Sequence, residues 1–314
     1  MKVFLAGATG VIGAPLVPRL LAAGHDVTGT TRVAGRAQDL RAAGVEPVVL
    51  DAFDADAVRA AVLAARPEVV ILQLTALPRR INPRRYAEAM EPTSRLREET
   101  TPVFVAAARE AGARRVVVQS ISFVTGPDGP PVHDETAPLY LDGPGAIGAP
   151  IRATAAMERC VTGADGLDGV VLRYGFLYGP GTVFAPDGSS VEEIRKRRYP
   201  VVGSGEGRFS FVHVEDAAAA TVLALDTGAA GIYNITDDDP APMRDWLPEA
   251  ARIIGAPKPR RVPAWVARLA VGPHAVHWGT TLRGNANAKA RRDLGFVPAY
   301  PTWREGFTQA LVER

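Results

Sequence analysis

The sequence predicts an α/β protein with a doubly wound parallel β-sheet and a smaller C-terminal α/β lobe. Short apolar segments without polar alternation recur through the first half of the chain, as in strands that are buried on both faces of a sheet. Helical patterns separate these segments, and alternation of strand and helix is typical of a doubly wound sheet. A glycine-rich turn, GATGVIG, connects the first strand to the first helix.

The strands are predicted in chain order at 2–7, 26–32, 47–51, 68–76, 114–122, 169–175 and 231–236. The glycine turn opens a helix that runs to Leu21, and further helices are expected over 54–65 and 94–111. After residue 182 the pattern changes, because Pro and Gly become frequent and the helical patterns become short. A helix with its cap at Asp216 is then expected to return the chain to the sheet.

The chain is expected to cross more than once between two parts. Residues 1–178 form the sheet domain, to which the chain returns at about 209–236. The substrate-binding lobe comprises 179–208 and 237–314, with three or four helices and one short strand after residue 240. A ligand is expected in the cleft between them, at the carboxyl ends of the strands.

The composition excludes several classes of function. Among 314 residues, 36 are Lys or Arg and 34 are Asp or Glu, and no basic block stands out. Nucleic acid and an anionic membrane surface are therefore not expected as partners. No apolar run reaches the roughly 20 residues of a membrane span, and the N-terminal glycines argue against a secretory signal. The single cysteine, Cys160, provides neither a disulfide nor a cysteine-rich metal site, so we expect a cytoplasmic protein without a metal.

The glycine turn predicts a dinucleotide-binding site. Gly7 allows the tight turn, Gly10 lets a diphosphate approach the backbone, and Gly13 lets the helix pack on the strand. The free amides and the positive end of the helix dipole then bind the phosphates. The other residues of the turn that belong to this predicted site are Thr9, Val11 and Ile12.

Arg32, at the end of the second strand, predicts which dinucleotide binds. A site specific for NAD(H) carries an acidic residue there, which binds the ribose 2′-hydroxyl. An arginine pairs instead with a 2′-phosphate, and Arg36 follows closely. We therefore predict NADP(H) rather than NAD(H), the alternative being a solvent-exposed arginine without a ligand.

Two further strand ends contribute to the predicted cofactor site. Asp51 ends the third strand, where it either meets the adenine amine or caps the next helix. The fourth strand ends in residues whose backbone is expected to flank a ribose. These residues are Leu74, Thr75 and Ala76.

Five segments of the chain occur in an order that is typical of one family. They are the glycine turn, VVVQSIS, LRYGFLYGPGT, FSFVHVEDAAAA and GIYNITDD. Through them the chain resembles the extended short-chain dehydrogenase/reductase family, the NAD-dependent epimerase/dehydratase group, over nearly its whole length. The resemblance implies a Rossmann-type domain, a nicotinamide cofactor and a small-molecule substrate in the C-terminal lobe. It also implies a homodimer formed through the helices near 94–111 and 150–162.

One departure from the family is plain. Its members usually act through a Ser or Thr after the fifth strand and through Tyr-x-x-x-Lys on the next helix. The tyrosine exchanges a proton with the substrate oxygen, and the lysine lowers the pKa of the tyrosine and holds the ribose. A glutamate often follows four residues after the lysine. Glu158 fits this glutamate, which puts Thr154 at the lysine position and Pro150 at the tyrosine position, and no Tyr-x-x-x-Lys occurs in the chain.

Other residues must therefore serve as candidate catalytic groups. The family's Ser/Thr aligns with Ile121, so either flanking serine, Ser120 or Ser122, is expected to reach the cleft or to bond the local backbone. Tyr140 in a Pro/Gly-rich loop and Tyr178 at the mouth of the site are candidate proton donors, with packing or substrate contact as the alternative role. Further polar side chains expected near the cleft are His133, Arg152 and Tyr174, whereas His213 is expected on a strand, buried against the returning helix as a core histidine.

The substrate is not expected to be a nucleotide sugar. Family members that bind one often carry an arginine seven residues before the position of Asp216, and Phe209 stands there. Arg208 is one residue away, which on a strand is the opposite face. Several aromatic residues in the C-terminal part suggest an apolar or aromatic substrate, or a core of large side chains.

Together these features predict an NADP(H)-dependent oxidoreductase for a small, fairly apolar carbonyl or enone substrate, with a non-standard proton donor. Reduction of a conjugated double bond suits the missing tyrosine, because its proton can come from solvent. Two alternatives stay open. One is a non-redox isomerase, lyase or cyclase on the same fold, and the other is a catalytically silent NADP(H)-binding protein.

Overall fold

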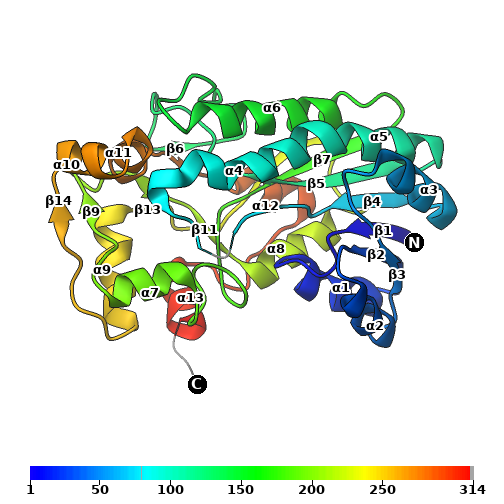
Figure 1. Ribbon diagram of the computed structural model, residues 1–314, viewed down its shortest axis with the longest axis horizontal. Helices are drawn as coiled ribbons and strands as arrows, with labels where there is room; N and C mark the ends of the chain where they lie inside the picture. Colours follow the sequence, from blue (N-terminus) through cyan, green and yellow to red (C-terminus); the bar gives the residue numbers. More distant parts are fainter. Residues whose placement is uncertain (79, 312–314) are drawn as a thin grey trace.

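A seven-stranded parallel sheet forms the centre of the molecule (Figure 1). The structure, a computed structural model, describes residues 1–78 and 80–311. The strands lie in the order β12-β7-β5-β4-β1-β2-β3, which confirms the predicted doubly wound, Rossmann-type α/β fold. Their bounds are β1 (Lys2–Ala6), β2 (Asp26–Thr31), β3 (Glu46–Val49), β4 (Val69–Leu72), β5 (Arg115–Ile121), β7 (Asp168–Tyr174) and β12 (Gly231–Ile235).

Helices cover both faces of the sheet, and this explains the continuous apolar strands. In β1, Val3 and Leu5 pack into one core while Phe4 packs into the other. The first face is covered by α1 (Gly13–Ala22), α2 (Ala34–Ala42), α8 (Val214–Leu223) and α12 (Ala288–Leu294). The second is covered by α3 (Ala55–Ala65), α5 (Thr101–Glu110) and α6 (Gly148–Thr162).

The helix predicted over 94–111 begins earlier and is interrupted. α4 (Tyr86–Arg95), preceded by the 3₁₀ turn η1 (Pro83–Arg85), continues into one π-helical turn, η2 (Leu96–Thr100), and then into α5. Pro102 cannot donate to the carbonyl of Glu98, and its ring would clash with that carbonyl in a regular helix. The wider π turn just before Pro102 relieves this conflict, and such turns are frequent at functional sites.

The C-terminal part is built around aromatic side chains. Within the described residues after 240 there are five helices, α9 to α13, and three short strands, β13 to β15, where three or four helices and one strand were predicted. Phe209, Phe211, Trp246, Trp303 and Phe307 are fully buried together, so most of the aromatic residues expected near a substrate are core. Its helices are α7 (Ser189–Arg195), α9 (Met243–Ile253), α10 (Ala264–Ala270), α11 (Pro273–Thr280) and α13 (Trp303–Ala310). The short strands are β6 (Val132–His133), β8 (Phe176–Tyr178), β9 (Val201–Val202), β10 (Arg208–Phe209), β11 (Phe211–His213), β13 (Ala241–Pro242), β14 (Arg261–Val262) and β15 (Gly284–Asn285).

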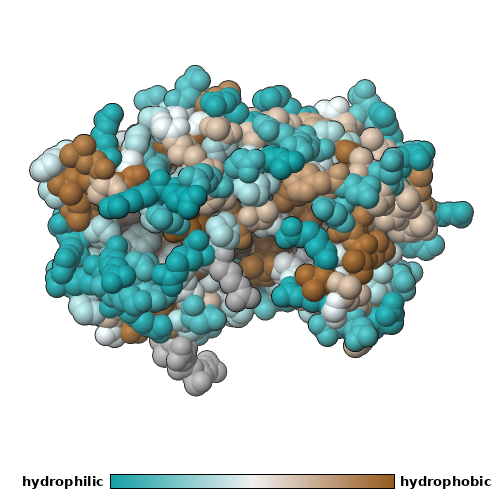
Figure 2. All heavy atoms as spheres, in the orientation of Figure 1, coloured by the Kyte–Doolittle hydropathy of each residue, from teal (hydrophilic) through white to brown (hydrophobic). Residues whose placement is uncertain are grey.

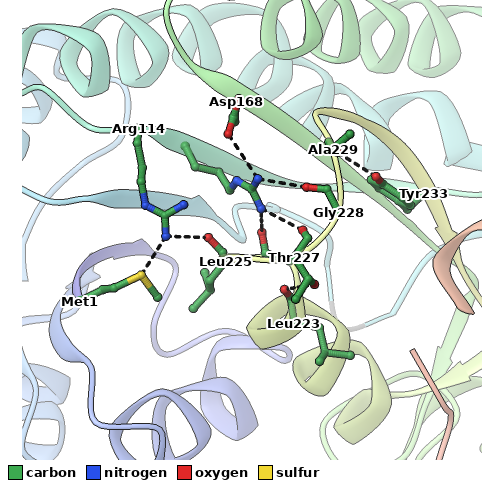
Figure 3. Close-up of polar contacts among 11 residues, drawn as sticks. Met1, Arg114, Asp168, Leu223, Leu225, Thr227, Gly228, Ala229 and Tyr233 are labelled. Atoms are coloured by element: carbon green, nitrogen blue, oxygen red, sulfur yellow. Dashed lines mark hydrogen bonds and ion pairs between the residues drawn. The ribbon is translucent and has the colours of Figure 1, made fainter. Parts of the chain in front are cut away.

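Arg115, at the start of β5, ties α8 and the segment after it to the sheet. Figure 3 labels three of its partners, Asp168, Thr227 and Gly228. Its guanidinium donates to the carbonyls of Ala224, Thr227 and Gly228 at 2.9–3.1 Å and pairs with Asp168 at 3.3 Å. A cation suits the carbonyl end of a helix because of the helix dipole. This network lies at the edge of the sheet where β5 and β7 begin, away from the predicted cleft.

The cap of α8 differs from the prediction. His213 caps the helix, since its Nδ1 accepts from the amide of Glu215 at 3.2 Å. The carboxylate of Asp216 instead accepts from the amides of Ala299 and Tyr300, at 2.8 and 3.1 Å. Asp216 therefore holds the C-terminal segment against α8. Because His213 is buried, and Arg19 lies near it, the pKa of its imidazole is lowered to about 4.

A histidine with a lowered pKa makes stability depend on pH. The unfolded state takes up a proton near pH 6.5, whereas folded His213 resists protonation until about pH 4. The free energy of unfolding therefore falls as pH drops from 6.5, by about 1–2 kcal/mol from this group between pH 6.5 and 5. His213→Asn keeps a capping acceptor and removes this part of the decline. Urea unfolding of both proteins between pH 5 and 8 checks it, and a difference between them that does not change with pH would contradict the assignment.

Candidate functional site

The glycine turn has no room for side chains at two of its three glycines. Gly7 has φ +93°, and a Cβ there would lie 2.4 Å from the carbonyl oxygen of Gln73. A Cβ at Gly13 would lie 2.1 Å from the carbonyl oxygen of Gly7. At Gly10 the same contact is 3.2 Å, so the methyl of an alanine is tight there as well. The turn thus brings bare backbone to the start of α1.

The amides of this turn fit a diphosphate. Among the described residues, the amides of Val11 and Ile12 have no hydrogen-bond acceptor, and they stand directly before α1. Unpaired amides at a helix N-terminus bind anions. The hydroxyl of Thr9 donates to Thr31 at 3.4 Å and holds the turn against the end of β2. These residues would hold the pyrophosphate of a dinucleotide.

Two arginines follow β2, whose last residue, Thr31, contacts Thr9 of the glycine turn. Arg32 is exposed, and Arg36 on α2 donates to the carbonyl of Thr9 at 3.2 Å. The exposed Asp51 accepts from the amide of Phe53 at 3.1 Å. It is Asp54 that caps α3, by accepting from the amide of Ala57 at 3.0 Å, so the capping alternative for Asp51 is wrong.

Exposed apolar side chains lie at the same carboxyl ends of the strands. Val33 follows β2 and Phe53 follows β3, and both are exposed. A dinucleotide needs such surfaces for its adenine ring. Next to them, β4 ends at Leu72, earlier than expected, and the half-buried residues Leu74, Thr75 and Ala76 lie in the loop that follows it. The amide of Ala76 donates to Thr93 of α4 at 3.0 Å, which fixes this loop.

Helix α6 keeps its position but carries no proton donor at the expected places. Pro150 lies in the first turn, where proline suits a helix. Thr154 is fully buried, and its hydroxyl donates to the carbonyl of Pro150 at 2.8 Å. The same oxygen accepts from the guanidinium of Arg97 at 2.7 Å. Neither position therefore offers a proton to a ligand.

A buried ion pair fixes α6 to the sheet. Arg173 on β7 donates through Nε and Nη2 to Glu158 at 2.8 and 2.6 Å, and both side chains are less than 5% exposed. Ser120 on β5 donates to the same carboxylate at 2.7 Å and is itself fully buried. This corrects the expectation that Ser120 reaches the cleft. Ser122 is also buried, but its hydroxyl has no partner among the described residues and stays a candidate.

Tyr178 belongs to the aromatic core and not to the mouth of the cleft. Its ring is fully buried, and a Cβ at Gly306 would lie 1.8 Å from its hydroxyl oxygen. Burial raises the pKa of Tyr178 far above its ordinary value. The hydroxyl has no hydrogen-bond partner within the described chain. The role of proton donor expected for Tyr178 is therefore corrected to a packing role.

Tyr140 is the candidate tyrosine that is not sealed in the core. It is half-buried beside His277, with 5.2 Å between the ring centroids. The other candidates have structural partners: buried His133 contacts Thr125 and the carbonyl of Asp128, both at 2.9 Å. The hydroxyl of Tyr174 forms a hydrogen bond with the hydroxyl of Thr221 at 2.7 Å. The exposed Arg152 donates to the carbonyl of Leu141 at 2.7 Å.

Three side chains in this region were missed by sequence reasoning. Phe123 and Phe176 follow the adjacent strands β5 and β7 and stack with 4.2 Å between their centroids. Arg97 is buried within the π turn, although the charged run SRLREET is typical of an exposed helix face. Only the irregular turn, which no local pattern signals, brings Arg97 inward.

The surface is hollowed between the sheet domain and the C-terminal part (Figure 2). One hollow, of about 580 Å³, is lined by Pro180, Gly181, Asp187, His213 and Tyr300. A Cβ at Gly181 would lie 3.9 Å from Val11, so this hollow adjoins the glycine turn. Among residues 1–78 and 80–311, no helix is long and apolar enough to cross a bilayer, and no three His, Cys, Asp or Glu residues are arranged to hold a metal.

Residues 3–236 match the model of the NAD dependent epimerase/dehydratase family. The chain belongs to this family. A Streptomyces protein named 3-diazoavenalumate denitrifying reductase is 50% identical over 307 residues, which cover 98% of this chain and 99% of that protein. A Stigmatella aurantiaca protein named 4-hydroxy-2-methyl-3-oxo-4-farnesyl-3,4-dihydroquinoline-1-oxide ketoreductase is 29% identical, over 79% of this chain and 71% of that protein.

Solved structures of the family share the whole fold. The Thermus thermophilus UDP-glucose 4-epimerase in complex with NAD has a TM-score of 0.74 and 25% identity, over 99% of this chain and 98% of that one. A human epimerase family protein with NADPH has a TM-score of 0.73 and 21% identity, over 99% of both chains. With the family and its reductase relatives, the chain is an NAD(P)-dependent oxidoreductase with a nicotinamide cofactor.

Proposed function

We propose that this protein is an NADPH-dependent reductase that removes the diazo group from a small aromatic carboxylate and releases N₂. The observation that carries the proposal is that α6 has no free proton donor at either expected position, where Pro150 and the engaged hydroxyl of Thr154 stand. Reduction of a ketone creates an alkoxide, which needs a proton. A diazonium group is a cationic acceptor and needs none. The 50% identical relative, named a denitrifying reductase, supports this reading.

The proposed reaction balances without a further reagent. When bound, the reduced nicotinamide supplies a hydride to the terminal nitrogen of the diazonium group. In the resulting neutral diazene the C–N and N–H bonds break. N₂ leaves, and the hydrogen is bound as a proton by the ring carbon, which keeps the electron pair of the C–N bond. The diazonium ion and NADPH thus become the arene, N₂ and NADP⁺.

The residues of this chain bind and orient the reactants. The glycine turn and Arg32 hold the cofactor, as their geometry beside α1 supports. The stacked rings of Phe123 and Phe176 offer an apolar face to an aromatic substrate. Arg80 pairs with Glu192 and Glu193 of α7, so the segment after β4 contacts the C-terminal part.

A second candidate function is reduction of a ketone or enone with Tyr140 as the proton donor. The half-buried position of Tyr140 favours it, because the phenol is neither bonded to a protein partner nor sealed within the described structure. Relatives below 30% identity that are named ketoreductase and 2-alkyl-3-oxoalkanoate reductase support the same chemistry.

Two probes with the same carboxylate separate these functions. We expect the enzyme to oxidise NADPH in the presence of 4-carboxybenzenediazonium, with one N₂ and one benzoate formed for each NADPH consumed. We expect no oxidation with 4-acetylbenzoate, because no residue on α6 protonates its alkoxide. Absorbance of the reduced nicotinamide and gas analysis measure both, and a sample without enzyme corrects for direct reduction.

The opposite pattern would contradict the proposal. Turnover of 4-acetylbenzoate that is lost in Tyr140→Phe, without enzyme-dependent release of N₂ from the diazonium probe, supports the ketone reductase. Absence of enzyme-dependent NADPH oxidation with both probes contradicts both functions for substrates of this size.

Arg32 is predicted to select the phosphorylated cofactor. In Arg32→Asp, the carboxylate repels the 2′-phosphate and accepts a bond from the 2′-hydroxyl of NADH. We expect NADPH to bind about 10–100-fold more weakly, as for loss of one charged hydrogen bond, and NADH affinity to be retained or improved. Fluorescence titration measures both affinities, with Arg41→Asp on α2 as the matched control. Equal losses for the two cofactors would show that Arg32 does not read the phosphate.

A further inference from the structure

Arg97 is a buried cation with almost no protein partners. Its side chain is 8% exposed and lies in the π turn between α4 and α5. Among the described residues, the hydroxyl of Thr154 is its single hydrogen-bond partner, at 2.7 Å. A guanidinium carries five N–H donors, and a buried charge without an anion is costly. Most of its hydrogen-bonding capacity is therefore free for a ligand.

No carboxylate of the described chain neutralises Arg97. Glu158 is close enough to influence it, but that carboxylate is already held by Arg173 and by Ser120. No acidic side chain lies within ion-pair distance of Arg97 in the described structure. The other group that influences it is Tyr86, whose pKa burial raises to about 12, so that phenol is neutral at physiological pH.

The position of Arg97 is at the predicted cleft. Thr93, one turn earlier on α4, accepts from the amide of Ala76, in the loop after β4 where a ribose is expected. On its other side, Arg97 contacts Thr154, the position where the family carries its lysine. An aromatic group lies near the same helix: Tyr86 stacks on His274 at 5.0 Å and meets the edge of Trp278 at 5.1 Å.

We propose that Arg97 binds the carboxylate of the substrate, and that the π turn exists to aim it at that group. The choice of a carboxylate rests on the proposed function, but the anion site itself rests on the buried guanidinium. A planar guanidinium matches a carboxylate in a bidentate arrangement. The carboxylate of the substrate neutralises the guanidinium of Arg97, which no acidic side chain of the described chain does. The site therefore binds acids more tightly than their neutral esters.

The experiment measures binding, so that it does not depend on diazo chemistry. Calorimetry with saturating NADP⁺ compares cinnamate with methyl cinnamate as unreactive probes. We expect the wild type to prefer the acid, and Arg97→Met to lose this preference through about 10–100-fold weaker binding of cinnamate, with the ester unchanged. Arg97→Lys keeps the charge and should retain part of the preference. Arg159→Met, an exposed arginine on α6, is the matched control and should behave as wild type.

A stability measurement separates this role from a structural one. Removing a buried charge without a counter-ion should leave the melting temperature of the protein without ligands equal or higher in Arg97→Met. A structural role would give a different result. The melting temperature of Arg97→Met would fall by several degrees, Arg97→Lys would keep the preference for cinnamate, and the preference would be lost only in a partly unfolded Arg97→Met.

Other outcomes would also overturn the inference. One is a wild type that does not prefer the acid. Others are an Arg97→Met variant whose cinnamate affinity is unchanged, or whose affinities for acid and ester fall equally. A fall in NADP⁺ affinity alone would assign Arg97 to the cofactor ribose. If the acid preference depends on Arg97 while the diazonium probe is not turned over, the anion site stands and the proposed reaction fails.

Discussion

The buried pair of Glu158 and Arg173 is the constraint on which the centre of the molecule depends. It joins α6 to β7, and the bond from Ser120 extends it to β5. Breaking a buried pair by removing one partner costs about 3–5 kcal/mol. The pair thus holds α6 at the cleft whatever its first turns carry, and this explains how the helix persists where Pro150 and Thr154 replace a tyrosine and a lysine.

The residues that hold α6 in place are thus different from the residues at positions 150 and 154, and this difference determines the chemistry of the site. Positions 150 and 154 of α6 offer no proton donor, and the proposed hydride acceptor is therefore one that is already electron-poor. Position 154 carries no lysine, and the hydroxyl of Thr154 instead accepts a hydrogen bond from the buried guanidinium of Arg97 on the π turn. The same chain therefore keeps the cofactor cradle of its family and changes the groups that face the substrate.

The features predicted correctly from the sequence are those that depend on residues close together in the chain. The apolar strands and the glycine turn between the first strand and the first helix depend on neighbours in the chain, and the structure confirms them. The errors concern contacts between distant residues. Ser120 is captured by Glu158, 38 residues away, and Tyr178 packs on Gly306. Arg97 is buried against Thr154, 57 residues away, on a π turn that no periodic pattern signals.

The central claim is that hydride transfer proceeds without a proton from a side chain. Single-turnover oxidation of NADPH by 4-carboxybenzenediazonium, followed in H₂O and in D₂O with a viscosity control, tests this most directly. The account predicts the same rate in both solvents, a ratio of about 1, because no proton moves in that step. A ratio of about 2 or more that disappears in Tyr140→Phe would contradict it and identify Tyr140 as the general acid.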